Sequence, residues 1–142
     1  AGSNSLEWVE AFDVLPEDET DPEPIAIRKF EADSKLLAAA HRTQHLYQKG
    51  KVVEGTIGSA DVWNNELDRI HFFYQNYGTS VEEMEAASVA QIASQFNVPF
   101  IGVRVVSNNI TNGGSYDAGT GEACQDFVLE VAEQYMSEQL KD

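Results

Sequence analysis

The sequence predicts an α/β fold with a mainly parallel sheet, because segments with the apolar pattern of strands alternate with amphipathic helical segments. A length of 142 residues suits one domain and is too short for two ordinary ones. An apolar content of 42% with 10% aromatic residues is typical of a chain that folds around a core, whereas a disordered acidic tail has far fewer aromatics. We therefore expect a single domain over residues 1–142, with residues 1–29 as a loop-rich lead-in.

The charge and the cysteine content exclude several classes of protein. A formal charge of −15 disfavours nucleic acid and anionic membranes as partners, because both would repel the chain. The sequence contains no run of about 18 apolar residues that would span a bilayer. The single cysteine, Cys124, excludes an internal disulfide. The first residues lack the pattern of a signal peptide, which favours the cytoplasm without establishing the compartment.

The first half of the chain contains two predicted helices around a predicted strand. Asp33 is an N-cap residue type, and the apolar positions after it recur at helical spacing up to the expected C-cap, Gly50. A strand over 52–57 follows. A second amphipathic helix is predicted over 67–77, and Gly78 ends it.

The second half continues the alternation with a short extended segment at 80–84. The next helix has an apolar stripe at positions i, i+3, i+4 and i+7, formed by Val89, Ile92, Ala93 and Phe96. Asn97 and Pro99 stop this helix, and the near-continuous apolar run 100–106 predicts a strand buried on both faces. After a loop over 108–121, a last helix is expected with one apolar face, formed by Cys124, Val128, Val131 and Tyr135.

Polar residues follow three of the apolar segments, at 59–65, 82–85 and 107–112. In parallel sheets, ligands bind where the carboxyl ends of the strands meet the loops. The residues alone therefore predict a binding site formed by these three segments.

The same region carries a more specific signal in three stretches, VEEMEAA at 81–87, NVPF at 97–100 and VRVVS at 103–107. Together they resemble the C-terminal half of the purine nucleoside phosphorylase and nucleosidase superfamily, and most of all the methylthioadenosine/S-adenosylhomocysteine nucleosidases. The resemblance covers roughly residues 30–135. It implies a three-layer fold of the phosphorylase type, in which helices flank a mainly parallel mixed sheet.

Members of that family are much longer than this chain, and their N-terminal half supplies the acidic residue that activates water and part of the ribose and anion site. Because the chain also begins with Ala1 rather than an initiator methionine, we expect an upstream half of the same protein as a companion segment. The resemblance also implies a homodimer, in which a neighbouring subunit closes the pocket over the 5′ substituent of a purine nucleoside.

The resemblance assigns the sugar to the VEEMEAA stretch. Cleavage of an N-glycosidic bond requires that the sugar be held while positive charge builds on it. Glu85 is implied as the catalytic carboxylate, because it can accept from both ribose hydroxyls and its charge favours such a transition state. The alternative for Glu85 is a cap on the following helix. Met84 is expected as an apolar floor under the ribose, or else as core packing, and Glu83 completes the sugar-binding set.

The resemblance implies that the base stacks on Trp63, which stands where the family has an aromatic residue. Such stacking contributes ~1–3 kcal/mol. The backbone of Asn64 would then face the edge of the base. Ser107 is expected to hydrogen-bond the base or Asn108. Arg104 lies in an apolar segment, where its charge must be paired, and a structural ion pair and a ligand contact are both open.

Asn108 stands where the nucleosidases have a catalytic Asp, and it is the second residue implied as catalytic. An amide can recognise a purine edge but cannot transfer a proton. That change leaves three alternatives open: a 6-oxopurine substrate, slow cleavage of adenine nucleosides, or binding without turnover. The alternative is a left-handed turn residue beside Asn109.

The sequence thus predicts an N-glycosidic hydrolase that acts on a nucleoside such as methylthioadenosine or S-adenosylhomocysteine. The alternatives are a nucleoside phosphorylase, a 6-oxopurine nucleosidase, and a non-catalytic nucleoside-binding or storage-type protein on the same fold. No cofactor is expected. No metal is expected either. His41 and His45 have a spacing on a helix that could hold a metal ion, but the sequence shows no evident third ligand.

Overall fold

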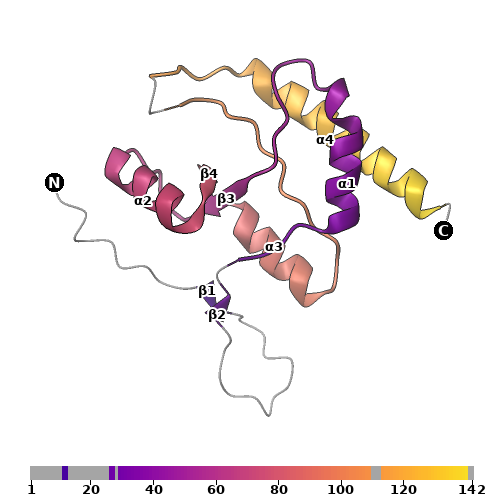
Figure 1. The fold of residues 1–142 in the computed structure, drawn as a ribbon, viewed down its shortest axis with the longest axis horizontal. Coiled ribbons are helices and arrows are strands. Elements are labelled where there is room, and N and C mark those ends of the chain that lie inside the picture. The colour runs from indigo at the N-terminus through magenta and orange to yellow at the C-terminus, as the bar shows by residue number, and fades with distance from the viewer. Residues whose placement is uncertain (1–10, 13–25, 28, 110–112, 141–142) are drawn as a thin grey trace, which may run out of the picture.

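The computed structural model describes residues 11–12, 26–27, 29–109 and 113–140 (Figure 1). Its strands are β1 (Ala11–Phe12), β2 (Ala26–Ile27), β3 (Thr56–Ser59) and β4 (Thr79–Glu83). Its helices are α1 (Ser34–Thr43), the 3₁₀ turn η1 (Gln44–Leu46), α2 (Leu67–Tyr77), α3 (Ala86–Gln95) and α4 (Gly119–Gln139). Most of the predicted lead-in over 1–29 lies outside the described residues.

The central unit is β3–α2–β4, in which the two strands pair in parallel and the helix connects them. Ile57 faces Val81 in the register, and Ser59 faces Glu83. This β-α-β unit confirms the predicted α/β class. The predicted three-layer sheet does not form within the described residues, which contain only this pair and the antiparallel pair β1–β2.

The predicted strand over 100–106 is wrong for the part of the chain that the structure describes, because that segment is assigned to no strand. A strand requires a neighbouring backbone with which to form a ladder, and an apolar run does not supply one. The segment is held instead by single contacts, among them a hydrogen bond of 2.8 Å from the Asp33 N–H to the Phe100 carbonyl. The predicted strand over 52–57 likewise begins only at Thr56.

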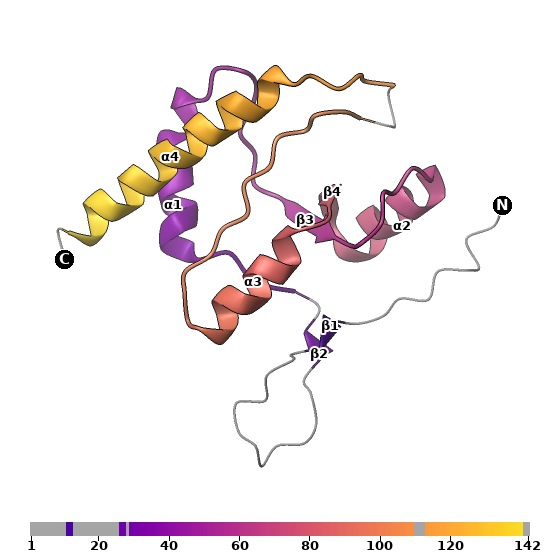
Figure 2. The same ribbon diagram turned by 180° about the vertical axis from the view of Figure 1, so that it is seen from behind.

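The core lies between α1 and α4, which pack against each other and cross in both views (Figure 2). Ala39 and Ala40 on α1 meet Phe127 and Val131 on α4, and all four are buried. Alanine side chains allow the two helices to approach closely, so that the larger side chains of α4 fill the space. Residues packed around this cluster are Tyr47, Val52, Ile101, Val103 and Tyr135.

The ends of two helices follow local signals. The Asp33 carboxylate accepts the N–H groups of Lys35 at 3.0 Å and Leu36 at 2.9 Å, which confirms the predicted N-cap of α1. Gly78 ends α2 in the left-handed conformation, with φ of 68°, also as predicted. After α3, Asn97 takes a positive φ of 53° before Pro99.

Gly50 is not the C-cap of α1, because the helix ends at Thr43 and continues only as the 3₁₀ turn to Leu46. Side chains terminate it earlier. The Thr43 hydroxyl donates to the Ala39 carbonyl at 3.0 Å, and the Gln44 amide donates to the His41 carbonyl at 2.8 Å. These bonds satisfy carbonyls at the end of the helix without a glycine.

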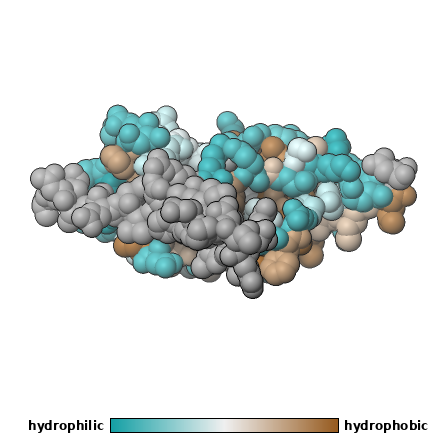
Figure 3. All heavy atoms as spheres, turned by 90° about the horizontal axis from the view of Figure 1, so that it is seen from below, coloured by the Kyte–Doolittle hydropathy of each residue, from teal (hydrophilic) through white to brown (hydrophobic). Residues whose placement is uncertain are grey.

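The apolar stripe of α3 forms a helix as predicted, but it lies at the surface. Val89, Ile92 and Phe96 are exposed, while Ala86 and Ala90 are the buried residues of the helix. With Val98, the stripe lines a shallow groove of about 540 Å³. Apolar residues also reach the surface in the view from below (Figure 3). No helix in the described part of the chain is both long and apolar enough to cross a membrane.

Candidate active site

Two of the three predicted polar segments meet at the carboxyl ends of β3 and β4. The parallel register places Ser59, the last residue of β3, opposite Glu83, the last residue of β4. The Ala60 N–H then donates to the Glu83 carbonyl at 3.0 Å and extends the contact by one residue. The predicted convergence of 59–65 with 82–85 is therefore confirmed.

Glu83 is the most enclosed carboxylate of this edge, with 11% of its side chain exposed. It accepts hydrogen bonds from the Ser59 hydroxyl, from the backbone N–H groups of Glu85 at 3.0 Å and Ala86 at 2.9 Å, and from the Arg104 Nε at 3.0 Å. Burial raises the pKa of Glu83, but these hydrogen bonds outweigh it and lower the pKa to about 2. The carboxylate is thus ionised and fully engaged by the protein.

Glu83 and Ser59 together cap α3. The Ser59 oxygen accepts the N–H of Ala87 at 2.9 Å, and Glu83 takes the N–H groups just before it. The capping role that the sequence left open for Glu85 therefore belongs to Glu83, and Glu85 makes no side-chain capping bond. The assignment of Glu83 to the sugar site stays a prediction.

Glu85 presents an exposed carboxylate at the rim, with 64% of its side chain exposed. The Arg104 guanidinium lies 3.4 Å from its Oε2 and also pairs with Glu83, so that it bridges the two carboxylates. Of the two possibilities for Arg104, the structure has the ion pair, in a half-exposed position. Unlike Glu83, Glu85 retains acceptor capacity that faces solvent.

Trp63 and Met84 flank this edge, and both are exposed. Trp63 is 67% exposed on the turn between β3 and α2, and Met84 is 44% exposed directly before Glu85. The core-packing alternative for Met84 is therefore wrong in this structure. Asn64, next to Trp63, donates from its side chain to the Glu82 carboxylate at 2.7 Å.

Arg104, which precedes the third predicted segment 107–112, reaches the edge. Ser107 and Asn108 instead contact each other, and the Ser107 carbonyl accepts the N–H of Asp117. The Ser107 hydroxyl donates to the Asn108 Oδ1 at 2.9 Å, which fits the predicted contact between them. Asn109 forms an isolated bridge with Gly114, and residues 110–112 lie outside the description. Asn108 is not left-handed, since Asn97 alone has a positive φ among the described non-glycine residues.

Sequence reasoning missed Ser59 as a cap and Arg104 as the bridge between the two glutamates. The signal for Ser59 is the parallel register, which sets it opposite Glu83. Cys124 lies on α4 and is partly buried; burial raises the pKa of its thiol, while Arg104 acts in the opposite direction.

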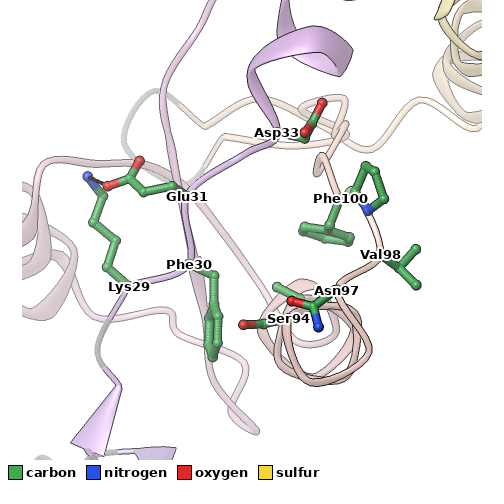
Figure 4. Close-up of a pocket in the computed structure, with 10 residues that line it drawn as sticks. Lys29, Phe30, Glu31, Asp33, Ser94, Asn97, Val98 and Phe100 are labelled. Carbon is green, nitrogen blue, oxygen red and sulfur yellow. Dashed lines mark ion pairs between the residues drawn. The ribbon is translucent and has the colours of Figure 1, made fainter. Parts of the chain in front are cut away.

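The described residues contain no group of three or more His, Cys, Asp or Glu placed to hold a metal ion. His41 pairs with Glu54 at 3.1 Å, and the His45 ring contacts the Arg42 carbonyl at 3.0 Å. A separate open cavity of about 440 Å³ lies at the other end of α3, where Ser94, Asn97 and the rings of Phe30 and Phe100 line it (Figure 4).

Comparison with known proteins finds a match to the model of the Phosphorylase superfamily over residues 7–139. Curated relatives described as 5'-methylthioadenosine/S-adenosylhomocysteine nucleosidase come from several bacteria. That of Shewanella pealeana is 35% identical over 89 residues, 62% of this chain and 39% of the relative. That of Desulfotalea psychrophila is 31% identical over 118 residues, 80% of this chain and 49% of the relative. That of Bacillus licheniformis is 36% identical over 80 residues, 56% of this chain and 35% of the relative. The chain spans less than half the length of these relatives.

Proposed function

Because the chain belongs to the phosphorylase superfamily, we propose that it carries the sugar- and base-binding edge of a purine nucleosidase site. The reaction is hydrolysis of the N-glycosidic bond of a nucleoside such as methylthioadenosine or S-adenosylhomocysteine. The names of the curated relatives support this substrate class. The observation that carries the proposal is the difference between two carboxylates. Glu83 is hydrogen-bonded to groups of the protein, whereas Glu85 is exposed at the rim, where a ligand can reach it.

In this proposal Glu85 accepts hydrogen bonds from the ribose hydroxyls, and Met84 packs under the sugar. As the bond from the anomeric carbon to the purine nitrogen breaks, positive charge builds on the sugar, and the nearby carboxylate stabilises it. The oxygen of a water molecule bonds to the anomeric carbon. The water gives up one proton, and the purine takes up one proton as it leaves. Trp63 stacks on the base. Ser107 and Asn108 hydrogen-bond its edge.

We further propose that the site is completed by an upstream half of the same protein, in a homodimer. The exposed stripe of α3 supports a covering partner, because Val89, Ile92 and Phe96 form an apolar surface without charge. In the family that the chain resembles, the upstream half holds the acidic group that activates water. The chain together with such a half is therefore the form in which activity is expected.

The test is chromatographic detection of free base from methylthioadenosine, S-adenosylhomocysteine, adenosine and inosine, with and without phosphate. We expect free base and free sugar without phosphate. Glu85→Gln is expected to lower kcat/KM by about 10²–10³-fold, because it removes the charge opposite the transition state. Glu122→Gln, at the start of α4, is the matched control. Sugar phosphate as the product would establish phosphorolysis, and absence of both turnover and nucleoside binding would overturn the proposal.

Asn108→Asp separates a slow enzyme from a binding protein. Acid catalysis typically contributes ~10²–10⁴-fold, so the restored carboxyl should raise turnover of adenine nucleosides by about 10²-fold. An increase confined to adenine nucleosides supports the nucleosidase. Unchanged binding without any gain in turnover would instead support a nucleoside-binding protein on the same fold.

A further inference from the structure

We propose that Asn64 is a positioning residue, whose side-chain amide ties the turn bearing Trp63 to the end of β4 and thereby sets the place of the indole. The part of this inference that concerns nucleoside binding rests on the proposed function. The tie itself is a property of the chain and can be tested without a ligand.

The two ends of the Asn64 amide bind partners of fixed polarity. Its Nδ2 donates to the Glu82 Oε2 at 2.7 Å, and its Oδ1 accepts the backbone N–H of Glu66 at 3.2 Å. A carboxylate only accepts and a backbone N–H only donates, so the orientation of the amide is determined. One side chain thus connects β4 with the residue that precedes α2.

The turn has few other attachments near Trp63. The Ala60 N–H donates to the Glu83 carbonyl at 3.0 Å, and the Val62 N–H makes only a local bond to the Ala60 carbonyl at 2.7 Å. Trp63 is 67% exposed, so core packing does not orient its ring. Its backbone lies between the anchors at Ala60 and Asn64, and these decide where the indole is presented.

Glu82 is the right anchor for this purpose because it directly precedes the stretch that holds the sugar site. A turn fixed to Glu82 is fixed relative to Met84 and Glu85, two and three residues further on. The tie therefore sets the separation between the stacking ring and the carboxylate at the rim. Both partners are accessible to water, so we expect an effect of several-fold rather than of orders of magnitude.

The first experiment measures Trp63 alone, in a Trp8→Phe background, by fluorescence anisotropy and acrylamide quenching. Asn64→Leu removes both hydrogen bonds and is expected to lower the anisotropy and raise the quenching constant about two-fold. Asn65→Leu is the matched control, since no hydrogen bond of the Asn65 side chain occurs within the described residues. Equal behaviour of the two variants would overturn the inference.

A polarity swap tests the specific bond. Asn64→Asp keeps an acceptor for Glu66 but sets two carboxylates against each other, and it should loosen Trp63 as Asn64→Leu does. Adding Glu82→Gln to Asn64→Asp supplies an amide donor on the other side and should restore the anisotropy. A double variant as loose as Asn64→Asp alone would show that the bond to Glu82 does not position the turn.

The second experiment measures turnover by the chain with its upstream half. Asn64→Leu should raise KM about 3–10-fold and leave kcat within about 2-fold, because stacking contributes equally to ground state and transition state. The double swap should restore KM. If Asn64 instead contacted the base itself, the swap would restore anisotropy without restoring KM, which would overturn its role as a positioning residue. A wild-type chain that neither binds nor cleaves nucleosides would reject the proposed function, while the anisotropy results would still decide on the tie.

Discussion

The α1–α4 pair and the edge formed by β3, β4 and α3 are held together by different forces. Between α1 and α4, Phe127 and Val131 pack on two alanines, and Tyr47 meets Phe127 edge-on with ring centroids 5.8 Å apart. At the edge, the central group is Glu83, a carboxylate surrounded by hydrogen-bond donors. The first region depends mainly on apolar area removed from water, with an ion pair between Arg42 and Glu138 at 2.7 Å beside it, and the second depends on charge and hydrogen-bond geometry.

This difference separates stability from function in the molecule. The stabilisation that apolar packing contributes does not change with pH, and substitutions at exposed positions leave it largely intact. Such packing therefore suits a scaffold. A polar network responds to protonation and leaves neighbouring groups such as Glu85 open to a ligand. The two regions should therefore react differently to mutation and to acid, and the following predictions test that contrast.

The largest effect is expected from Phe127→Ala, which removes the largest side chain of the buried cluster. Loss of this ring should lower the free energy of unfolding by about 3–5 kcal/mol. Urea denaturation at neutral pH measures it, with Leu129→Ala, an exposed residue of the same helix, as the control within about 0.5 kcal/mol. A loss below about 1 kcal/mol would mean that α1 and α4 do not enclose the main core.

Glu83→Gln should cost less, roughly 2–3 kcal/mol at neutral pH, because it removes the charge that Ser59, Arg104 and two backbone N–H groups stabilise. The folded-state pKa of Glu83, about 2, lies below that of an unfolded chain. Its stabilisation is therefore fully present above pH about 4.5 and is lost as the pH falls toward 2.

Urea denaturation repeated from pH 7 down to pH 2 measures this dependence. Glu83→Gln should flatten the curve between pH about 4.5 and 2, whereas Phe127→Ala should shift it without changing its slope. An identical acid dependence in wild type and Glu83→Gln would show that another carboxylate is responsible.

The smallest effect is expected from Asp33→Ala, which removes the N-cap of α1 and should cost about 1 kcal/mol. Thermal unfolding followed by circular dichroism measures it. Asp33→Ser keeps a side-chain acceptor and should recover most of the loss. Equal losses in the two variants would mean that Asp33 acts through something other than its cap.

Short-range signals in the sequence predicted much of the helical structure. Asp33 can cap, Gly78 can adopt a positive φ and Pro99 cannot continue a helix, and each of these properties is local. Gly50 shows the limit of such signals, because the side chains of Thr43 and Gln44 ended α1 before the glycine was reached.

Local signals in the sequence likewise predicted one part of the candidate site and missed another. Residue types and spacing were enough to predict that 59–65 and 82–85 lie together, because carboxyl ends of parallel strands share one edge. They did not distinguish Glu83 from Glu85 within the VEEMEAA stretch. Glu83 and Glu85 have the same chemistry, and only the pairing of Ser59 with Glu83 decides which of them is enclosed.

The sequence by itself thus determined the presence of the helices, the caps at Asp33 and Gly78, and the β-α-β order, since these depend on backbone preferences and on patterns within one segment. The tertiary structure decided what depends on a distant neighbour. The apolar run 100–106 found no backbone within the described residues with which to form a ladder, and the stripe of α3 found no covering layer there. Arg104 came to bridge Glu83 and Glu85 because the fold brings together residues about twenty positions apart, a contact that no local pattern encodes.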